Sequence, residues 1–218
     1  MSAVCRVPHC GLPTASRYSG HCRRHKSIIR RQGHHEQQAI RRSELRPYCD
    51  RAHGRIAKNA GSPIWAQLES RWQDLVASAR TDAGRRIGNR YQRAAANELV
   101  NIAGDVPFLS ITVTVCAMFM LRHDLPHRFA SDAAFRIQLA RRVRSLSSQH
   151  RGTCYDDKSG KQHWVYRELR PKVGAILGQN LSVVFGAVGL HLGALEERDR
   201  QQKQAEKRRF YEAMRGLK

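Results

Sequence analysis

Four side chains that commonly bind transition metals lie within the first 25 residues of the chain. They are spaced as Cys5-x4-Cys10-x11-Cys22-x2-His25. Thiolate and imidazole groups are the preferred ligands of zinc, and four of them complete a tetrahedral site. Because so short a segment cannot bury a hydrophobic core, a bound metal would have to supply its folding free energy. We therefore predict a structural zinc module at the N-terminus.

Two histidines leave the choice of ligands partly open. His9 could replace Cys10 as a ligand, and His21 could replace either Cys22 or His25. The three cysteines are the preferred assignment because zinc favours thiolates in structural sites. A catalytic zinc is not expected, since four protein ligands leave no open coordination position.

The residues around these ligands carry a resemblance to a known motif. The chain reads Cys10-Gly11, then Cys22-Arg23-Arg24-His25, and then Arg30-Arg31-Gln32-Gly33. This pattern resembles the short Cys/His zinc motif of phage and mobile-element DNA-binding proteins, which often lies beside HNH-type nuclease domains. The resemblance covers the segment up to Gly33 and implies zinc binding and DNA contact. Nuclease activity is not implied, because no suitably placed Asn and second His surround His34-His35.

Cysteine usage bears on the cellular compartment. Of the 6 cysteines, three lie in the first 22 residues and three are scattered. The segment from Met1 to Pro8 has no apolar run of the kind that a secretory signal contains. In a reducing cytoplasm, clustered cysteines indicate metal binding more often than disulfides. We expect a cytoplasmic, nucleoid-associated protein.

Positive charge is the second strong feature of the sequence. The chain has 39 Lys and Arg against 18 Asp and Glu, a net charge of +21. Residues 1–58 alone carry 13 basic and 3 acidic residues, a net of +10. Such an excess repels itself in a compact fold and is typically neutralised by a nucleic acid. Two alternatives to nucleic-acid binding are a basic surface that is merely solvated and binding to an anionic membrane surface.

Two groups of basic residues are the candidate nucleic-acid contacts. The first lies within and directly after the Cys22-x2-His25 pair, on or beside the zinc knuckle, and the second lies on a helix predicted to start at Ser131. Arginine predominates, and its planar fork suits both phosphate and guanine. The candidates are Arg23, Arg24, Lys26, Arg30, Arg31, Arg136, Arg141, Arg142 and Arg144.

The body of the chain has mostly helical periodicity. Residues 34–58 are expected to form a helical segment interrupted at Pro47, and residues 63–79 an amphipathic helix. The uncharged run 108–121 should be buried, its first half as a strand and its second half as a helix. Residues 153–156 and 162–166 are predicted to pair as a β-hairpin with a turn at Ser159-Gly160. A basic helix followed by a hairpin suggests a winged helix-turn-helix element.

Residues 173–195 form a run without formal charge, long enough to span a bilayer. Its heptad-like apolar stripe, broken by polar residues and glycines, favours a buried helix or a helix–helix seam instead. We expect no membrane insertion, and self-association or a protein partner through residues 177–195 as one interpretation. Residues 196–218 are predicted to be a charged helix.

The sequence thus predicts a mainly α fold, with an N-terminal zinc knuckle and one β-hairpin. The expected parts are a zinc module at 1–33, a basic helical linker at 34–61, a helical core at 62–195 and a charged helix at 196–218. The expected function is non-enzymatic DNA binding, regulatory or accessory to replication or recombination in a bacterium or mobile element. RNA binding and a protein–protein adaptor are the alternatives, and a nuclease is a further one.

Overall fold

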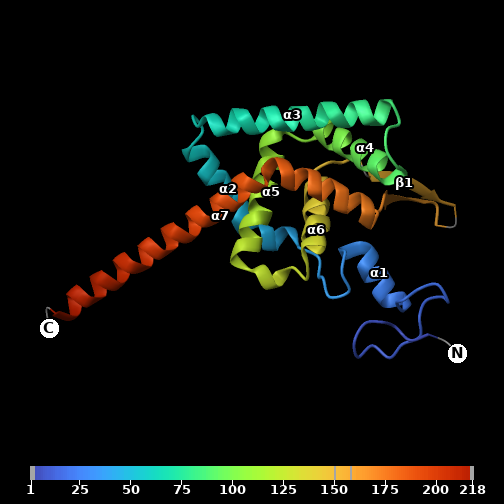
Figure 1. The fold of residues 1–218 in the computed structure, drawn as a ribbon, viewed down its shortest axis with the longest axis horizontal. Coiled ribbons are helices and arrows are strands. Elements are labelled where there is room, and N and C mark those ends of the chain that lie inside the picture. Colours follow the sequence, from blue (N-terminus) through green and yellow to red (C-terminus); the bar gives the residue numbers. More distant parts are fainter. Residues whose placement is uncertain (1–2, 150, 158, 217–218) are drawn as a thin grey trace.

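The computed structural model describes residues 3–149, 151–157 and 159–216 and confirms a mainly helical fold (Figure 1). One antiparallel hairpin, β1–β2, is inserted between the last two helices. The elements in chain order are α1 (Arg23–Gln32), α2 (Arg42–Lys58), α3 (Pro63–Gly84), α4 (Arg90–Asp105), α5 (Phe108–Asp124), a 3-10 turn η1 (Pro126–Arg128), α6 (Asp132–Arg144), β1 (Arg151–Asp156), β2 (Lys161–Tyr166) and α7 (Pro171–Gly216).

Helix α5 lies at the centre of the core, between α2 and α7. Ten of its residues, from Ile111 to Leu121, are buried on all sides of the helix. The prediction that the first half of this run is a strand is therefore wrong. Packing of α2, α6 and α7 around α5 outweighs the strand preference of its β-branched residues. Cys116 is fully buried, and burial raises the pKa of its thiol to about 12.

Helix α2 joins this core rather than standing apart from it. Leu45, Ala52 and Ile56 are buried, so the segment expected to be a linker supplies part of the core. The predicted interruption at Pro47 is wrong, because the helix continues through it. Pro47 lies near the start of α2, where the lost N–H removes a single early hydrogen bond.

Helices α6 and α7 cross at very short distance. Gly178 faces the backbone of Arg136, and a Cβ at this position would overlap the Arg136 carbonyl oxygen. Further along α7, a Cβ at Gly189 would lie 2.8 Å from Cβ of Phe119 on α5. The apolar stripe of α7 is buried in this seam, at Leu177, Leu181, Val184, Val188 and Leu192. The predicted stripe is thus covered by the chain's own helices.

The predicted β-hairpin is confirmed, with Thr153 opposite Trp164 and Asp156 opposite Lys161. Gly160, with a φ of 62°, supplies the left-handed residue of its turn. The preceding helix α6 is buried at eight of its positions and packs on α7. This burial does not leave α6 the free face that the recognition helix of a winged helix would need.

The C-terminal half of α7 leaves the core and projects into solvent (Figure 1). Where it leaves, Arg51 and Arg200 bind the carboxylate of Asp124, and Arg55 binds Glu196 and Asp199. By length and composition, residues Pro171–Glu212 could cross a membrane, but 56% of the apolar window is buried in the fold. A core helix meets the same criteria, so this is weak evidence for a membrane span.

The α6–α7 crossing gives a test of the fold. We expect Gly178→Ala to lower the free energy of unfolding by about 3 kcal/mol or more, because backbone rather than a flexible side chain blocks the new methyl group. Gly54→Ala is the matched control, since Gly54 lies inside α2 with open space around it. It should raise stability by about 0.5–1 kcal/mol. Urea unfolding of both variants measures the difference, and equal stabilities would contradict the crossing.

Candidate metal centre and arginine groove

The N-terminal module, residues 3–33, is built from two loops and one helix. Val4 pairs with Pro13, and the N–H of Cys5 donates to the carbonyl of Leu12 at 2.9 Å. His9, with a φ of 59°, turns the first loop so that Cys10 comes back beside Cys5. Left-handed backbone is uncommon outside glycine and marks this turn as structurally constrained.

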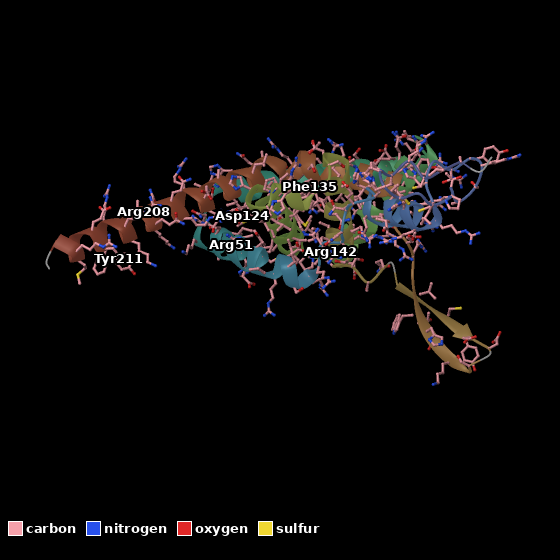
Figure 2. The ribbon with its side chains drawn as sticks, turned by 90° about the horizontal axis from the view of Figure 1, so that it is seen from below. Arg51, Asp124, Phe135, Arg142, Arg208 and Tyr211 are labelled. Carbon is pink, nitrogen blue, oxygen red and sulfur yellow. The ribbon has the colours of Figure 1, made fainter. Side chains whose placement is uncertain are left out.

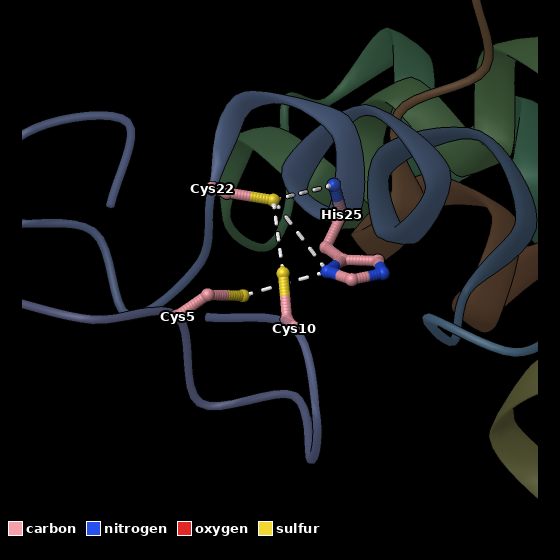
Figure 3. A group of neighbouring side chains, drawn as sticks. All are labelled: Cys5, Cys10, Cys22 and His25. Carbon is pink, nitrogen blue, oxygen red and sulfur yellow. Dashed lines mark hydrogen bonds between the residues drawn. The ribbon is translucent and has the colours of Figure 1, made fainter. Parts of the chain in front are cut away.

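Four side chains of this module meet at one point, which Figure 3 shows. Nδ1 of His25 lies 3.4 Å from Sγ of Cys5 and 3.5 Å from Sγ of Cys22. Sγ of Cys10 lies 3.8 Å from Sγ of Cys22. This Cys/His cluster is compatible with binding of a metal ion, and it consists of the four residues preferred from the sequence.

Helix α1 begins at the cluster. Cys22 is its N-cap, and the N–H of His25 donates to Sγ of Cys22 at 3.5 Å. The positive end of the helix dipole therefore faces this sulfur and favours negative charge on it. Because Cys22 and His25 lie on the same first turn, a metal held by both would also fix the start of α1.

Thiol ionisation differs sharply between the sulfurs. Burial raises the pKa of the Cys5 thiol, but backbone hydrogen bonds from Cys22 and Val7 outweigh it. Together with contacts to His25 and Cys10, they lower the pKa to about 6. For Cys10, a backbone hydrogen bond at Leu12 lowers the pKa, yet burial and the two neighbouring sulfurs raise it on balance. Adjacent thiolates repel, and a cation among them would relieve that repulsion.

The module has no hydrophobic core of its own. Among residues 3–33, only the side chains of Cys5 and Cys22 are buried. Apolar burial therefore contributes little to its stability, and the Cys/His cluster is its interior. Such a segment folds when a metal replaces the missing core.

The far end of α1 is attached to the body by hydrogen bonds. Gln138 of α6 is 1% exposed, and its amide nitrogen donates to the carbonyl of Gln32 at 3.1 Å. Its amide oxygen accepts from the N–H of Ile40 at 3.2 Å. Arg141 donates to the carbonyl of Arg31 at 2.8 Å. These bonds satisfy carbonyl groups that the end of a helix leaves free and orient α1 against α6.

This attachment brings together basic residues that are far apart in the sequence. A hollow of about 460 Å³ between α1 and the C-terminal end of α6 is lined by Arg31, Arg141, Arg142, Arg144 and Arg167. A second hollow of about 340 Å³ adjoins it, since Arg31 and Glu168 line both. We call the two together the arginine groove. Its charged residues are Arg23, Lys26, Arg30, Arg31, Arg141, Arg142, Arg144, Arg167 and Glu168.

The cationic side chains that line the groove outnumber its carboxylates. Its one lining carboxylate, Glu168, contacts Arg30 and lies 3.9 Å from Arg31. Burial, followed by the nearby charge of Arg141, lowers the pKa of Arg142, and its buried Nε has no hydrogen-bond partner among the described residues. Burial likewise lowers the pKa of Arg141. Because arginine stays protonated even so, these charges would be stabilised by an incoming anion.

Seven of the nine predicted contact residues line the groove, but not all in the same way. Arg144 is bound by the carboxylate of Glu98 at 2.7 Å and by the carbonyl of Arg167, which assigns it a structural role. Arg24 lines a separate hollow beside Glu36, and Arg136 lines neither half of the groove.

Arg167 was not among the predicted contacts, although it lines the larger hollow. It follows the hairpin in the basic stretch Arg167 to Lys172, and that run of charge was the available signal. Only the fold shows that this stretch returns to α1.

The chain has no significant match among protein-family models, curated proteins or solved structures. Its function must therefore be inferred from the Cys/His cluster and the groove.

Gln138 offers a test of how the module is attached. Gln138→Met keeps the side chain's length but removes the partner of the buried N–H of Ile40 and of the partly buried carbonyl of Gln32. At about 1–3 kcal/mol for each such group, we expect the free energy of unfolding to fall by about 2–6 kcal/mol and amide exchange in α1 to become faster. Gln201→Met, on the exposed part of α7, is the control. Unchanged exchange in α1 would mean that Gln138 does not hold the module.

Proposed function

We propose that this protein is a zinc-containing DNA-binding protein without enzymatic activity, which grips phosphates in the arginine groove. The observation that carries the proposal is the convergence of α1 and α6, whose arginines line one groove with a single carboxylate. Arginine binds phosphate through two parallel hydrogen bonds. A backbone of regularly spaced phosphates is the ligand that best matches such a row of guanidinium groups.

The distances in the Cys/His cluster support zinc as the metal. Zinc bonds of about 2.3 Å to sulfur and about 2.0 Å to nitrogen, at tetrahedral angles, place two sulfurs about 3.8 Å apart and sulfur about 3.5 Å from nitrogen. The corresponding distances here are 3.8 Å for Cys10–Cys22 and 3.4 and 3.5 Å from His25 to Cys5 and Cys22. Four protein ligands make this a structural site.

Zinc binding and the groove are linked through α1, which the metal would hold at one end and which lines the groove. The metal would hold Cys22 and His25, and with them the first turn of α1, while Gln138 holds its last turn. Arg23, Lys26 and Arg30 project from the helix between these two points. Their side chains are exposed and could reach phosphates, for which Arg30 would have to exchange its ion pair with Glu168.

DNA is proposed over RNA because the N-terminal motif resembles that of DNA-binding proteins and because arginine also reads guanine in the major groove. The role would be regulatory, or accessory to replication or recombination, in the cytoplasm. Competition between duplex DNA and RNA of matched length distinguishes the two nucleic acids.

The metal assignment can be tested by substitution. We expect Cys22→Ala to release the zinc ion and to weaken DNA binding, because the start of α1 loses its anchor. His21→Ala is the matched control, since His21 neighbours the cluster without belonging to it. It should keep both metal and affinity. Elemental analysis of the purified variants reports the metal, and full zinc content in Cys22→Ala would refute the ligand assignment.

The groove can be tested by removing charge. The triple variant Arg23→Gln, Lys26→Gln, Arg30→Gln should bind duplex DNA more weakly and with a smaller salt dependence. Each lost phosphate contact lowers the slope of log K against log salt by about 0.9, so a loss of up to about 2.7 is expected.

The control for this experiment removes the same charge elsewhere. Arg71, Arg80 and Lys203 are exposed on α3 and the outer part of α7, outside the groove. Changing these three to Gln should leave the slope nearly unchanged. Equal slopes in both triple variants would show general attraction to a basic protein instead of a binding groove.

A further inference from the structure

The β-hairpin projects from the body of the protein into solvent (Figure 2). Of the side chains described between Gly152 and Val165, none is buried. Two large aromatic residues on it are mostly exposed, Tyr155 at 62% and Trp164 at 66%. A two-stranded hairpin alone is only marginally stable in water, and a contiguous exposed apolar patch can mark a binding site.

Both aromatic rings lie on one face of the hairpin. Thr153 is paired with Trp164, and Tyr155 with Gln162. Paired residues share a face and successive residues alternate between faces, so these four form one surface. Tyr155 and Trp164 are diagonal neighbours on it, at a typical separation of about 7–8 Å. The opposite face carries Cys154, His163 and Val165.

The base of the hairpin adjoins the arginine groove. β2 ends at Tyr166, and the next residue, Arg167, lines the larger hollow. The carbonyl of Arg167 accepts a hydrogen bond from Arg144 at 2.7 Å, which fixes this junction to α6. Trp164 precedes Arg167 by three residues, about 10 Å along an extended strand. About three stacked nucleotides cover this distance at a rise of about 3.4 Å.

From this continuity we propose that the hairpin is a second nucleic-acid site, at which unpaired DNA bases stack on Tyr155 and Trp164. This inference rests on the proposed function, because the phosphates of the same strand would run into the arginine groove. Aromatic rings beside a cationic track are the arrangement that binds single strands with little sequence preference. Bases inside a duplex are already stacked on each other, so only unpaired bases can use these rings.

The test compares single-stranded and duplex DNA on the full, metal-loaded protein. Affinities for an oligo-dT strand and for a duplex of the same length are measured by fluorescence anisotropy. Trp164→Ala should bind oligo-dT about 5- to 100-fold more weakly, the range for loss of one aromatic stacking partner. Its affinity for the duplex should change less than about twofold. Tyr155→Ala should behave in the same way.

Two further variants distinguish the loss of an aromatic ring from unfolding of the hairpin. Trp164→Phe keeps an aromatic ring and should retain most of the affinity for oligo-dT. Val165→Ala removes apolar surface from the opposite face and should bind both ligands normally. Binding of oligo-dT should also quench tryptophan fluorescence in the wild type more than in Trp164→Phe.

Distinct outcomes separate this inference from the proposed function. If Trp164→Ala weakens binding of oligo-dT and of duplex DNA by the same factor, base stacking on the hairpin is overturned. The same holds if the variant binds both ligands as tightly as the wild type. Neither result contradicts phosphate binding in the arginine groove. If the wild type binds neither DNA form even at low salt, the proposed function itself fails.

Discussion

The position of α1 depends on polar attachments at its two ends. At its start, Cys22 and His25 belong to the Cys/His cluster, and at its end Gln138 and Arg141 bind the last carbonyl groups. No buried apolar side chain of α1 supports it in between. The helix thus presents an exposed basic face while its axis is fixed, which allows a basic surface to be both accessible and ordered.

The arginines of this protein fall into two groups, those paired with carboxylates and those that line the groove. Arg51, Arg55 and Arg200 are matched by carboxylates where α7 leaves the core. In the groove, by contrast, Arg142 is partly desolvated next to the cations Arg141 and Arg42, and its buried Nε has no hydrogen-bond partner among the described residues. An uncompensated charge of this kind is unfavourable in the free protein. The imbalance is explained if a polyanion completes the site.

Sequence reasoning identified what local spacing determines. The four residues of the Cys/His cluster follow from residue types within 25 positions, and the hairpin follows from its turn and its short polar-aromatic runs. Residues 108–121 were misjudged because burial on every side, rather than local preference, decides their conformation. The groove could not be foreseen, since it depends on how α6 crosses α7 and where Gln138 meets α1. The ion pair of Arg144 with Glu98 is equally a product of the tertiary fold.

The length of α7 sets the overall dimensions of the molecule. Its 46 residues extend about 69 Å at a rise of about 1.5 Å per residue. A compact chain of this size would have a radius of gyration of only about 17 Å. α7 starts two residues after Leu169 at the groove and ends at its exposed tip, near Phe210 and Met214. The protein therefore tumbles as an elongated particle, and its C-terminal tip is held at a long, nearly fixed distance from anything bound at the opposite end.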